Sequence, residues 1–317
     1  MEKKRLDYID IAKGIGIILV IIGHVYPYES ILNKWIYSFH MPLFFVLSGY
    51  TIKEYMSKKD FQRLIIPCII VSFIISLIQF PVSEYGFKYF ILHYIASLIG
   101  GSYSLNIFGI NLPYIGRIWF LISLFWTKLF YRIMLTKIKK HRLIVLIILS
   151  CVSLLIQNYV WLPQGFDFMF ISMTFMEFGY LLKNKFNYID KIKKYCIVVA
   201  SLITWLSCVF CFDVSLNMNK RQFNYGMVSI GVAILGCICV IEFSKILSNT
   251  IFSKMLIFFG KHSFELLIIN SMYPYFITVD FNKSVLLQAC FALLLHTVIV
   301  FLWIFLKRIK NILISFS

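Results

Sequence analysis

Residues 10 to 24 read Asp10-Ile11-Ala12-Lys13-Gly14-Ile15-Gly16-Ile17-Ile18-Leu19-Val20-Ile21-Ile22-Gly23-His24, a long apolar run with ionisable side chains at both ends. Such a run is typical of a membrane-spanning helix, in which ionisable groups are costly and usually functional. The step from Lys13 to His24 is almost three helical turns and about 16 Å of rise, so both side chains are expected on one face. Gly16, Val20 and Gly23 fall on or beside that face, where a partner helix or a ligand could come close. The stretch predicts a polar site built into a membrane span.

The composition of the chain fits a membrane protein. Of its 317 residues, 60% are hydrophobic and only 14% are charged, and the mean hydropathy is +0.84. Apolar runs recur along the whole chain, and no polar block is large enough for a separate soluble domain. We therefore predict an all-α, polytopic helix bundle in which residues 1–317 form a single membrane-embedded domain.

The apolar runs predict about ten membrane spans. They cover residues 9–27, 35–52, 64–82, 114–134, 143–161, 167–182, 195–213, 225–246, 263–279 and 284–306. Residues 90–99 are too few for a span and predict a short helix that lies at the membrane interface or dips inward.

The net charge of +17 follows this topology. With the N-terminus in the cytoplasm, most of the 31 Lys and Arg residues fall in cytoplasmic segments. The opposite segments hold only Lys34, Lys88, Lys220, Arg221 and Lys283. This is the positive-inside pattern, which places both termini in the cytoplasm and explains the basicity without a nucleic-acid partner.

Other signals in the chain are weak. The first apolar run is too long for a secretory signal peptide and predicts an uncleaved span. Cys208 and Cys211 have CxxC spacing, but they lie inside a predicted span, where such cysteines are usually small buried apolar residues. The sequence shows no zinc-binding spacing and no glycine-rich phosphate loop, so we predict no metal site.

A second histidine, His40, follows in the next predicted span. If the first two spans form an antiparallel hairpin that turns near residue 32, His24 and His40 lie at similar depth, toward the outer side. The two imidazoles could then share a proton, or each could be an interfacial residue hydrogen-bonded to a neighbour. Pro42 is expected to weaken the helix and free a carbonyl near the same level.

Further ionisable residues fall in the inner halves of later spans: Lys128, Arg132, Glu177, Glu242 and Glu265. They could neutralise one another or line an inward-facing polar cavity. Lys128 and Arg132 could instead extend their charged ends to the membrane surface. Glu177 lies deeper and needs a partner or a proton.

Three more residues are candidates for the lining of a cavity. Arg117 and Trp119 open the fourth predicted span on its outer side, where tryptophan is common in any membrane protein. Asn270 lies in the middle of the ninth span and needs a hydrogen-bond partner.

These segments resemble the membrane acyltransferase-3 family, and more narrowly its branch of sugar O-acetylases similar to fucose 4-O-acetylases. Asp10, Lys13 and His24 are similar to the family's first-span signature of a basic residue, ten spacers and a histidine, although arginine is commoner than lysine there. The run Phe39-His40-Met41-Pro42-Leu43-Phe44-Phe45-Val46-Leu47-Ser48-Gly49-Tyr50 resembles the branch's second span. Weaker similarities are Lys59 to Pro67, Trp119-Phe120-Leu121, Phe178-Gly179-Tyr180-Leu181 and Gly260-Lys261-His262-Ser263-Phe264. Family members often carry histidine where this chain has Asn270.

The resemblance implies a bacterial cytoplasmic-membrane enzyme with ten spans. It implies acyl transfer, most simply of acetyl, from cytoplasmic acyl-CoA (acetyl-CoA) as donor substrate, with no permanently bound cofactor. The expected acceptor is a hydroxyl of a cell-surface polysaccharide or of its lipid-linked sugar precursor. The expected partners are therefore acyl-CoA, a glycan and the lipid bilayer.

Roles for individual residues follow from the chemistry of O-acyl transfer, which needs a base for the hydroxyl proton and positive charge for the oxyanion. His24 is the candidate base, and His40 assists it or holds the acceptor. Lys13 lies too far inward to touch the reacting carbonyl and is expected to hold the donor's phosphate or pantetheine end. The remaining candidates are Asp10 to orient Lys13, Lys59 and Arg63 to assist it, and Ser48, Arg117, Trp119, Glu177 and Asn270 as cavity lining.

Other functions are open at this point. Intramembrane charges and broken helices also suit a transporter or flippase of a glycan precursor, although the chain shows no paired halves. A polysaccharide polymerase or ligase would commonly have a large outer loop, whereas the longest outer segment, residues 83–113, is modest. A purely structural membrane protein would not need His24 and Lys13.

Overall fold

Helices make up most of the computed structural model, which describes residues 6–27, 30–53, 55, 58–79, 86–100, 105–107, 110–112, 116–157, 159–276 and 284–315. The α-helices are α1 (Asp7–Gly23), α2 (Ile31–Tyr37), α3 (His40–Tyr50), α4 (Lys58–Leu64), α5 (Ile66–Gln79), α6 (Gly86–Gly100), α7 (Trp119–Lys137), α8 (Arg142–Ile156), α9 (Met169–Asn184), α10 (Lys191–Cys211), α11 (Met227–Leu247), α12 (Ser253–Lys261), α13 (Ser263–Phe276) and α14 (Val285–Ser315). Two short antiparallel hairpins pair β1 (Leu105–Ile107) with β2 (Ile110–Leu112) and β3 (Leu216–Asn217) with β4 (Gln222–Phe223). The prediction of an all-α protein is confirmed.

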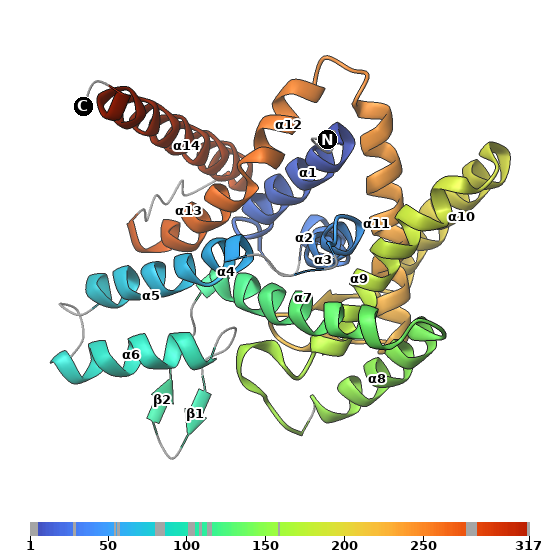
Figure 1. The fold of residues 1–317 in the computed structure, drawn as a ribbon, viewed down its shortest axis with the longest axis horizontal. Helices are drawn as coiled ribbons and strands as arrows, with labels where there is room; N and C mark the ends of the chain where they lie inside the picture. The colour runs from blue at the N-terminus through green and yellow to red at the C-terminus, as the bar shows by residue number, and fades with distance from the viewer. Residues whose placement is uncertain are drawn as a thin grey trace.

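Helix α3 lies at the centre of the bundle, with α1, α7, α9 and α11 around it (Figure 1). Its closest neighbour is α9, and α1 is packed most closely against α12. Helices α10 and α14 project at the periphery, so the core is built from α1, α3, α7, α9 and α11.

Glycines permit the two closest helix contacts. A Cβ atom on Gly179 of α9 would overlap the carbonyl oxygen of Val46 in α3, and one on Gly49 would overlap that of Met176. Gly260 of α12 lies in the same way against the carbonyl oxygen of Asp10 in α1. In a bilayer, where lipid is as apolar as leucine, such close backbone packing is a main source of helix association.

Five helices in the described part of the chain are long and apolar enough to cross a membrane: residues 60–78, 116–137, 191–211, 227–247 and 285–309. The outermost two leave large apolar side chains uncovered, such as Ile203, which is 61% exposed, and Leu294, which is 63% exposed. Lipid must cover such a surface, because water would make it prone to aggregate. The chain is a membrane protein. The number of ten spans and the cytoplasmic location of both termini stay predictions.

The second predicted span, 35–52, is two helices and not one. Helix α2 ends at Tyr37 and α3 begins at His40, and Phe39 between them is non-helical, with φ −146° and ψ −19°. Ser38 stabilises the break, since its hydroxyl donates to the Trp35 carbonyl and accepts from the Trp205 indole. Pro42 therefore lies in the first turn of α3, where proline is tolerated, and does not weaken a helix interior as expected.

Two other elements differ from the sequence prediction. Helix α6 extends from Gly86 to Gly100, beyond the expected 90–99, and packs on α5. A buried hydrogen bond of 2.7 Å joins Ser76 Oγ to His93 Nδ1 across that contact. Helix α12 was not predicted, because its nine residues are too few for a membrane span.

The ionisable residues predicted for the inner halves of the later spans do not pair with one another, and each meets a partner outside that set. Lys128 and Arg132 of α7 both reach Asp60 of α4, at 3.0 Å and 3.1 Å. Both cations are mostly buried, and Asp60 neutralises part of their charge. Glu242 pairs with Lys194 and Lys245.

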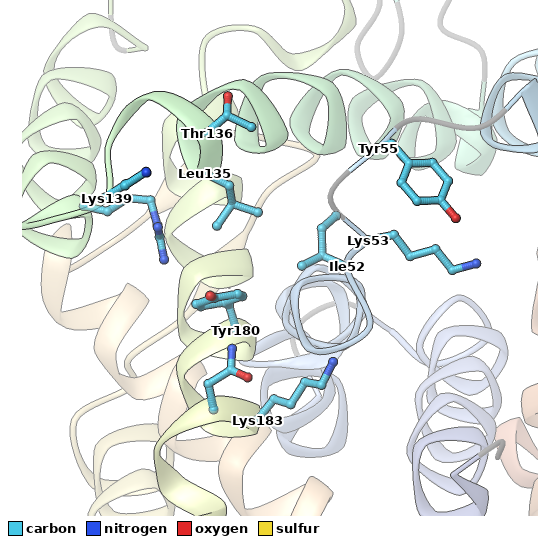
Figure 2. A pocket seen from close by; sticks show the side chains of 10 residues that line it. Ile52, Lys53, Tyr55, Leu135, Thr136, Lys139, Tyr180 and Lys183 are labelled. Atoms are coloured by element: carbon cyan, nitrogen blue, oxygen red, sulfur yellow. The ribbon is translucent and has the colours of Figure 1, made fainter. Parts of the chain in front are cut away.

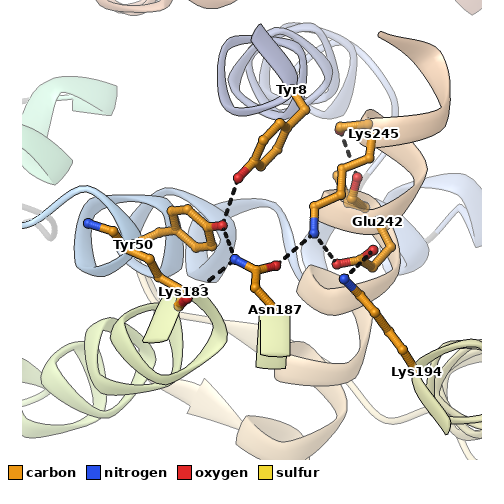
Figure 3. A network of polar contacts seen from close by, with 9 residues as sticks. Tyr8, Tyr50, Lys183, Asn187, Lys194, Glu242 and Lys245 are labelled. Carbon is orange, nitrogen blue, oxygen red and sulfur yellow. Dashed lines mark hydrogen bonds and ion pairs between the residues drawn. The ribbon is translucent and has the colours of Figure 1, made fainter. Parts of the chain in front are cut away.

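The ion pairs of Glu242 belong to a larger hydrogen-bond network that connects the ends of five helices (Figure 3). The hydroxyls of Tyr8 and Tyr50 are 2.7 Å apart, and Asn187 bonds both Tyr50 and Lys245. The beginnings of α1 and α10 therefore meet the ends of α3, α9 and α11 at one end of the bundle.

We expect Gly179→Ala to destabilise the protein by about 1–3 kcal/mol, because the added methyl group must displace the backbone of α3. The thermal unfolding midpoint in detergent measures the effect. Gly231→Ala is the matched control, since a Cβ at Gly231 in α11 meets nothing within 4 Å. Equal midpoints for the two variants would contradict the assigned role of the α3–α9 contact.

Candidate active site

His24 lies at the end of α1 and not inside a longer helix. The helix ends at Gly23, and His24 is its C-cap residue. The Asn33 amide nitrogen donates to the carbonyls of Gly23, Tyr26 and Pro27, at 3.0–3.2 Å. Asn33 is buried, and its amide group supplies hydrogen bonds to carbonyls at the end of α1 that have no partner within the helix. This cap fixes the turn that presents the imidazole of His24.

His24 lines a cavity of about 260 Å³, which we name the outer cavity after the predicted orientation of the chain. The lining residues come from α1, α2, α3, the start of α7 and the β3–β4 hairpin: His24, Tyr37, His40, Met41, Gly116, Arg117, Trp119, Leu216, Asn217, Met218, Asn219 and Lys220. The described lining contains two cationic side chains and no carboxylate. The cavity is therefore polar and has a positive bias.

His40 lines the same cavity, as the hairpin of the first two predicted spans implied. Its ring is buried, and Nδ1 lies 2.9 Å from the carbonyl oxygen of Ile36. A carbonyl only accepts, so Nδ1 carries the proton and Nε2 of the neutral ring is the free base. The Tyr37 ring lies 6.4 Å from that of His24 and 4.7 Å from that of His40. No hydrogen bond joins these two described imidazoles, so they do not share a proton directly.

Arg117 is held in the outer cavity by Asn270. Its Nη1 donates to the carbonyl oxygen and to Oδ1 of Asn270, at 2.6 Å and 2.7 Å. Asn270 is buried in α13 and does not line the cavity itself. Arg117 is the partner of the Asn270 side-chain oxygen, and Asn270 acts on the site by fixing that guanidinium.

A second, inner cavity of about 270 Å³ lies on the other side of Met41. Three cations line it, namely Lys13, Arg63 and Lys261, and they come from α1, α4 and α12. The remaining lining is mostly apolar: Ile17, Val20, Met41, Phe44, Leu47, Ser48, Leu64, Phe120, Leu121, Leu124, Gly260, Ser263, Phe264 and Leu267. The inner cavity thus combines positive charge with an apolar wall.

Asp10 and Lys13 form an ion pair of 3.8 Å one helical turn apart. The Asp10 carboxylate is 3% exposed, whereas the lysine side chain is 32% exposed. Lys13, Ile17 and Val20 line the inner cavity and His24 the outer one, so the face predicted from the spacing is the face that the cavities share.

The two cavities meet at one residue. Met41 lines both of them, and Trp119 of the outer cavity is followed in α7 by Phe120 of the inner one. Methionine is unbranched and flexible, which suits a side chain at a passage between two spaces. The arrangement can hold two substrates next to each other, one in each cavity.

Most predicted site residues lie in or beside these two cavities. Arg63 and Ser48 line the inner cavity, and Arg117 and Trp119 line the outer one. Lys59 is part of α4, but its side chain lies outside the described residues.

The prediction that Glu177 lines the cavity of the site is wrong. It lines neither cavity, because it is buried in a pair with Arg142 and accepts a hydrogen bond from the Tyr131 hydroxyl. The sequence showed the need for a partner but not that Arg142, one helix away, would meet it.

The sequence missed several lining residues, namely Tyr37, Met41, Asn217, Lys220 and Lys261. The hairpin that carries Asn217 and Lys220 is held down by Arg221, which bonds the buried carboxylate of Asp167 at 2.7 Å. The Arg221 guanidinium also lies 5.4 Å from the Trp161 ring. The available signal was that Lys220 and Arg221 are basic residues in a segment predicted to lie on the outer side, against the positive-inside pattern.

The acyltransferase-3 family model, described as an acyltransferase domain, matches residues 6–306. The chain therefore belongs to this family, and the protein is a membrane acyltransferase. No curated protein and no solved structure matches the chain.

We expect Glu177→Ala to lower the stability by about 3–5 kcal/mol, because it leaves the Arg142 guanidinium buried without its partner. The thermal midpoint measures this, and the double change Glu177→Met with Arg142→Met should recover most of the loss. An unchanged midpoint together with lost transferase activity would contradict this structural role and would indicate that Glu177 acts in the active site.

Proposed function

We propose that this protein is an O-acyltransferase that moves an acyl group, most simply acetyl, from cytoplasmic acyl-CoA to a hydroxyl of a cell-surface polysaccharide or of its lipid-linked precursor. The observation that carries the proposal is the pair of cavities that meet at Met41. One has three cations and an apolar wall, and the other has two histidines and an arginine.

The inner cavity suits the donor. Coenzyme A carries phosphates at one end and the thioester at the other, joined by a long, flexible pantetheine arm. Lys13, Arg63 and Lys261 would hold phosphate or the polar end of that arm by charge-assisted hydrogen bonds. The apolar wall between Ile17 and Leu124 would take the arm and direct the thioester toward Met41.

The outer cavity suits the acceptor and the base. His24 takes the proton of the acceptor hydroxyl as the oxygen attacks the thioester carbonyl. The C–O bond forms, the C–S bond breaks, and the leaving thiolate takes up a proton to give free coenzyme A. Arg117, fixed by Asn270, supplies positive charge for the oxyanion. His40 Nε2, whose ring is oriented by the Ile36 carbonyl, accepts a hydrogen bond from the acceptor or assists His24.

The sugar O-acetylase branch and a bacterial cytoplasmic membrane are part of the same proposal. Support for the branch comes from the run Phe39 to Tyr50, and support for the orientation comes from the positive-inside pattern. Lys13 and Arg63 then face the cytoplasm, where acyl-CoA is found.

We expect His24→Ala to abolish acyl transfer while the protein still inserts and accumulates, because the acceptor hydroxyl loses its base. The measurement uses membranes that contain the protein, acetyl-labelled acetyl-CoA and glycan from the host. His141→Asn is the control, since His141 is exposed and its φ of 58° suits asparagine. Normal labelling with His24→Ala would contradict the proposal, and no labelling by the wild type with several donors would favour a transporter.

We expect Lys13→Arg to retain activity and Lys13→Ala to raise the KM for acyl-CoA roughly tenfold, the loss of one charge-assisted contact. Initial rates over a range of donor concentrations measure this. Lys254→Ala in α12 is the control, because Lys254 is exposed and lines neither cavity. An unchanged donor KM in Lys13→Ala would show that the phosphate role is wrong.

A further inference from the structure

The two histidines of the outer cavity both depend on one short helix, α2. The amide nitrogen of Asn33 in α2 donates to three carbonyls at the end of α1, where His24 is the C-cap residue. The carbonyl of Ile36, in the last turn of α2, accepts the hydrogen bond from Nδ1 that orients the His40 ring. A shift of α2 would displace both imidazoles at once. The position of α2 therefore sets the position of both rings.

Helix α10 holds α2 in place through Trp205. The Trp205 side chain is buried, and its Nε1 donates to Ser38 Oγ at 3.0 Å. Ser38 is the C-cap residue of α2, and its hydroxyl donates in turn to the Trp35 carbonyl at 2.7 Å. The centre of the Trp205 ring lies 5.8 Å from that of Trp35 and 5.0 Å from that of Phe39. The indole thus packs on α2 and on both residues that separate α2 from α3.

A second link joins α2 to the segment that follows α10, and it is weaker. Lys34 Nζ lies 2.8 Å from Asp213 Oδ1, but the two side chains are 40% and 65% exposed. Water screens exposed ion pairs, so they contribute little to stability. A buried N–H donor that loses its acceptor is costly, because nothing replaces the lost hydrogen bond. The hydrogen bond from Trp205 is therefore the stronger of the two links.

The opposite end of α3 is held independently of α2. Lys53, which follows α3, lines a cavity of about 940 Å³ together with Tyr180 of α9 (Figure 2). The Lys53 carbonyl accepts a hydrogen bond of 2.9 Å from Arg132 Nε of α7. Helices α7 and α9 thus fix that end of α3, whereas α2 fixes the end that begins with His40.

We propose that Trp205 is a positioning residue for acyl transfer, because it holds α2 and, through α2, the two histidines of the outer cavity. This inference rests on the proposed function of His24 and His40. Trp205 lines neither the inner nor the outer cavity, so it acts through Ser38 and α2 and not on a substrate. The rate of transfer then depends on a residue of the peripheral helix α10.

The test compares Trp205→Phe with the wild type in membranes supplied with labelled acetyl-CoA and host glycan. Phenylalanine keeps an aromatic ring beside Trp35 and Phe39 but removes the N–H donor. We expect kcat to fall roughly tenfold, since displacement of a catalytic group by about 1 Å costs up to about 100-fold. The KM for the donor should stay unchanged, because neither Trp205 nor α2 belongs to the described lining of the inner cavity.

Trp126→Phe is the matched control. Trp126 of α7 also donates an indole hydrogen bond, of 2.6 Å to Gln164 Oε1, and it lines neither the inner nor the outer cavity. Its replacement should lower the thermal midpoint in detergent and leave kcat unchanged. The double variant Trp205→Phe with Ser38→Ala should be no slower than Ser38→Ala alone, because both changes break the same hydrogen bond.

The nitrogen NMR signals of the His40 ring, in protein isotope-labelled at histidine and assigned with His40→Gln, give a readout without turnover. We expect Trp205→Phe to change them, since the Ile36 carbonyl moves with α2, and Trp126→Phe to leave them unchanged. An unchanged kcat or an unchanged His40 signal in Trp205→Phe would overturn the inference, as would an equal loss of kcat in Trp126→Phe. Absence of transfer by the wild type would instead contradict the proposed function, and the His40 signal would still decide whether Trp205 positions the ring.

Discussion

The site depends on the backbone contact between α1 and α12. Gly260 lies directly against the carbonyl of Asp10, and Gly14 lies against that of Leu256, so neither helix can carry a side chain at the crossing. This proximity places Lys13 and Lys261, which belong to helices far apart in the sequence, in one cavity wall. The α3–α9 contact positions the wall that α3 contributes to both cavities, because it fixes α3 against α9, a buried helix. The cavities exist because the backbones between them are held in place by close contact.

A second constraint is the cost of charge inside a membrane. Asp60, Glu177 and Glu242 each meet at least one cation from another helix. An unpaired buried ion would cost several kcal/mol, whereas a paired one roughly breaks even. The cations of the two cavities are placed differently, since none of the described residues that line either cavity is acidic and the partner of Lys13, Asp10, lies outside the lining. Positive charge that lines an open space, and not a packed core, is suited to a negatively charged substrate or transition state.

The sequence predicts the helical class, the apolar runs and the common face of Lys13, Val20 and His24, because these follow from local periodicity. It does not predict the break between α2 and α3, which rests on a hydrogen bond from Trp205 to Ser38. Nor does it predict the cap on α1, since Asn33 looks like an ordinary loop residue until its three carbonyl partners are known. Lys261 was not predicted to line a cavity, because α12 is too short to be recognised as a membrane helix. What the sequence misses is, in each case, a contact between residues that are distant along the chain or a helix below the length of a span.

We propose that the acyl group passes from the inner to the outer cavity beside Met41. The most direct measurement uses sealed membrane vesicles, with labelled acyl-CoA confined to the side that Lys13 faces and with acceptor on the other side. We compare Met41→Leu, which keeps the volume of the side chain, with Met41→Trp, which should close the junction. We expect that Met41→Leu transfers label and that Met41→Trp binds the donor but transfers none. Full transfer by a correctly folded Met41→Trp variant would contradict it.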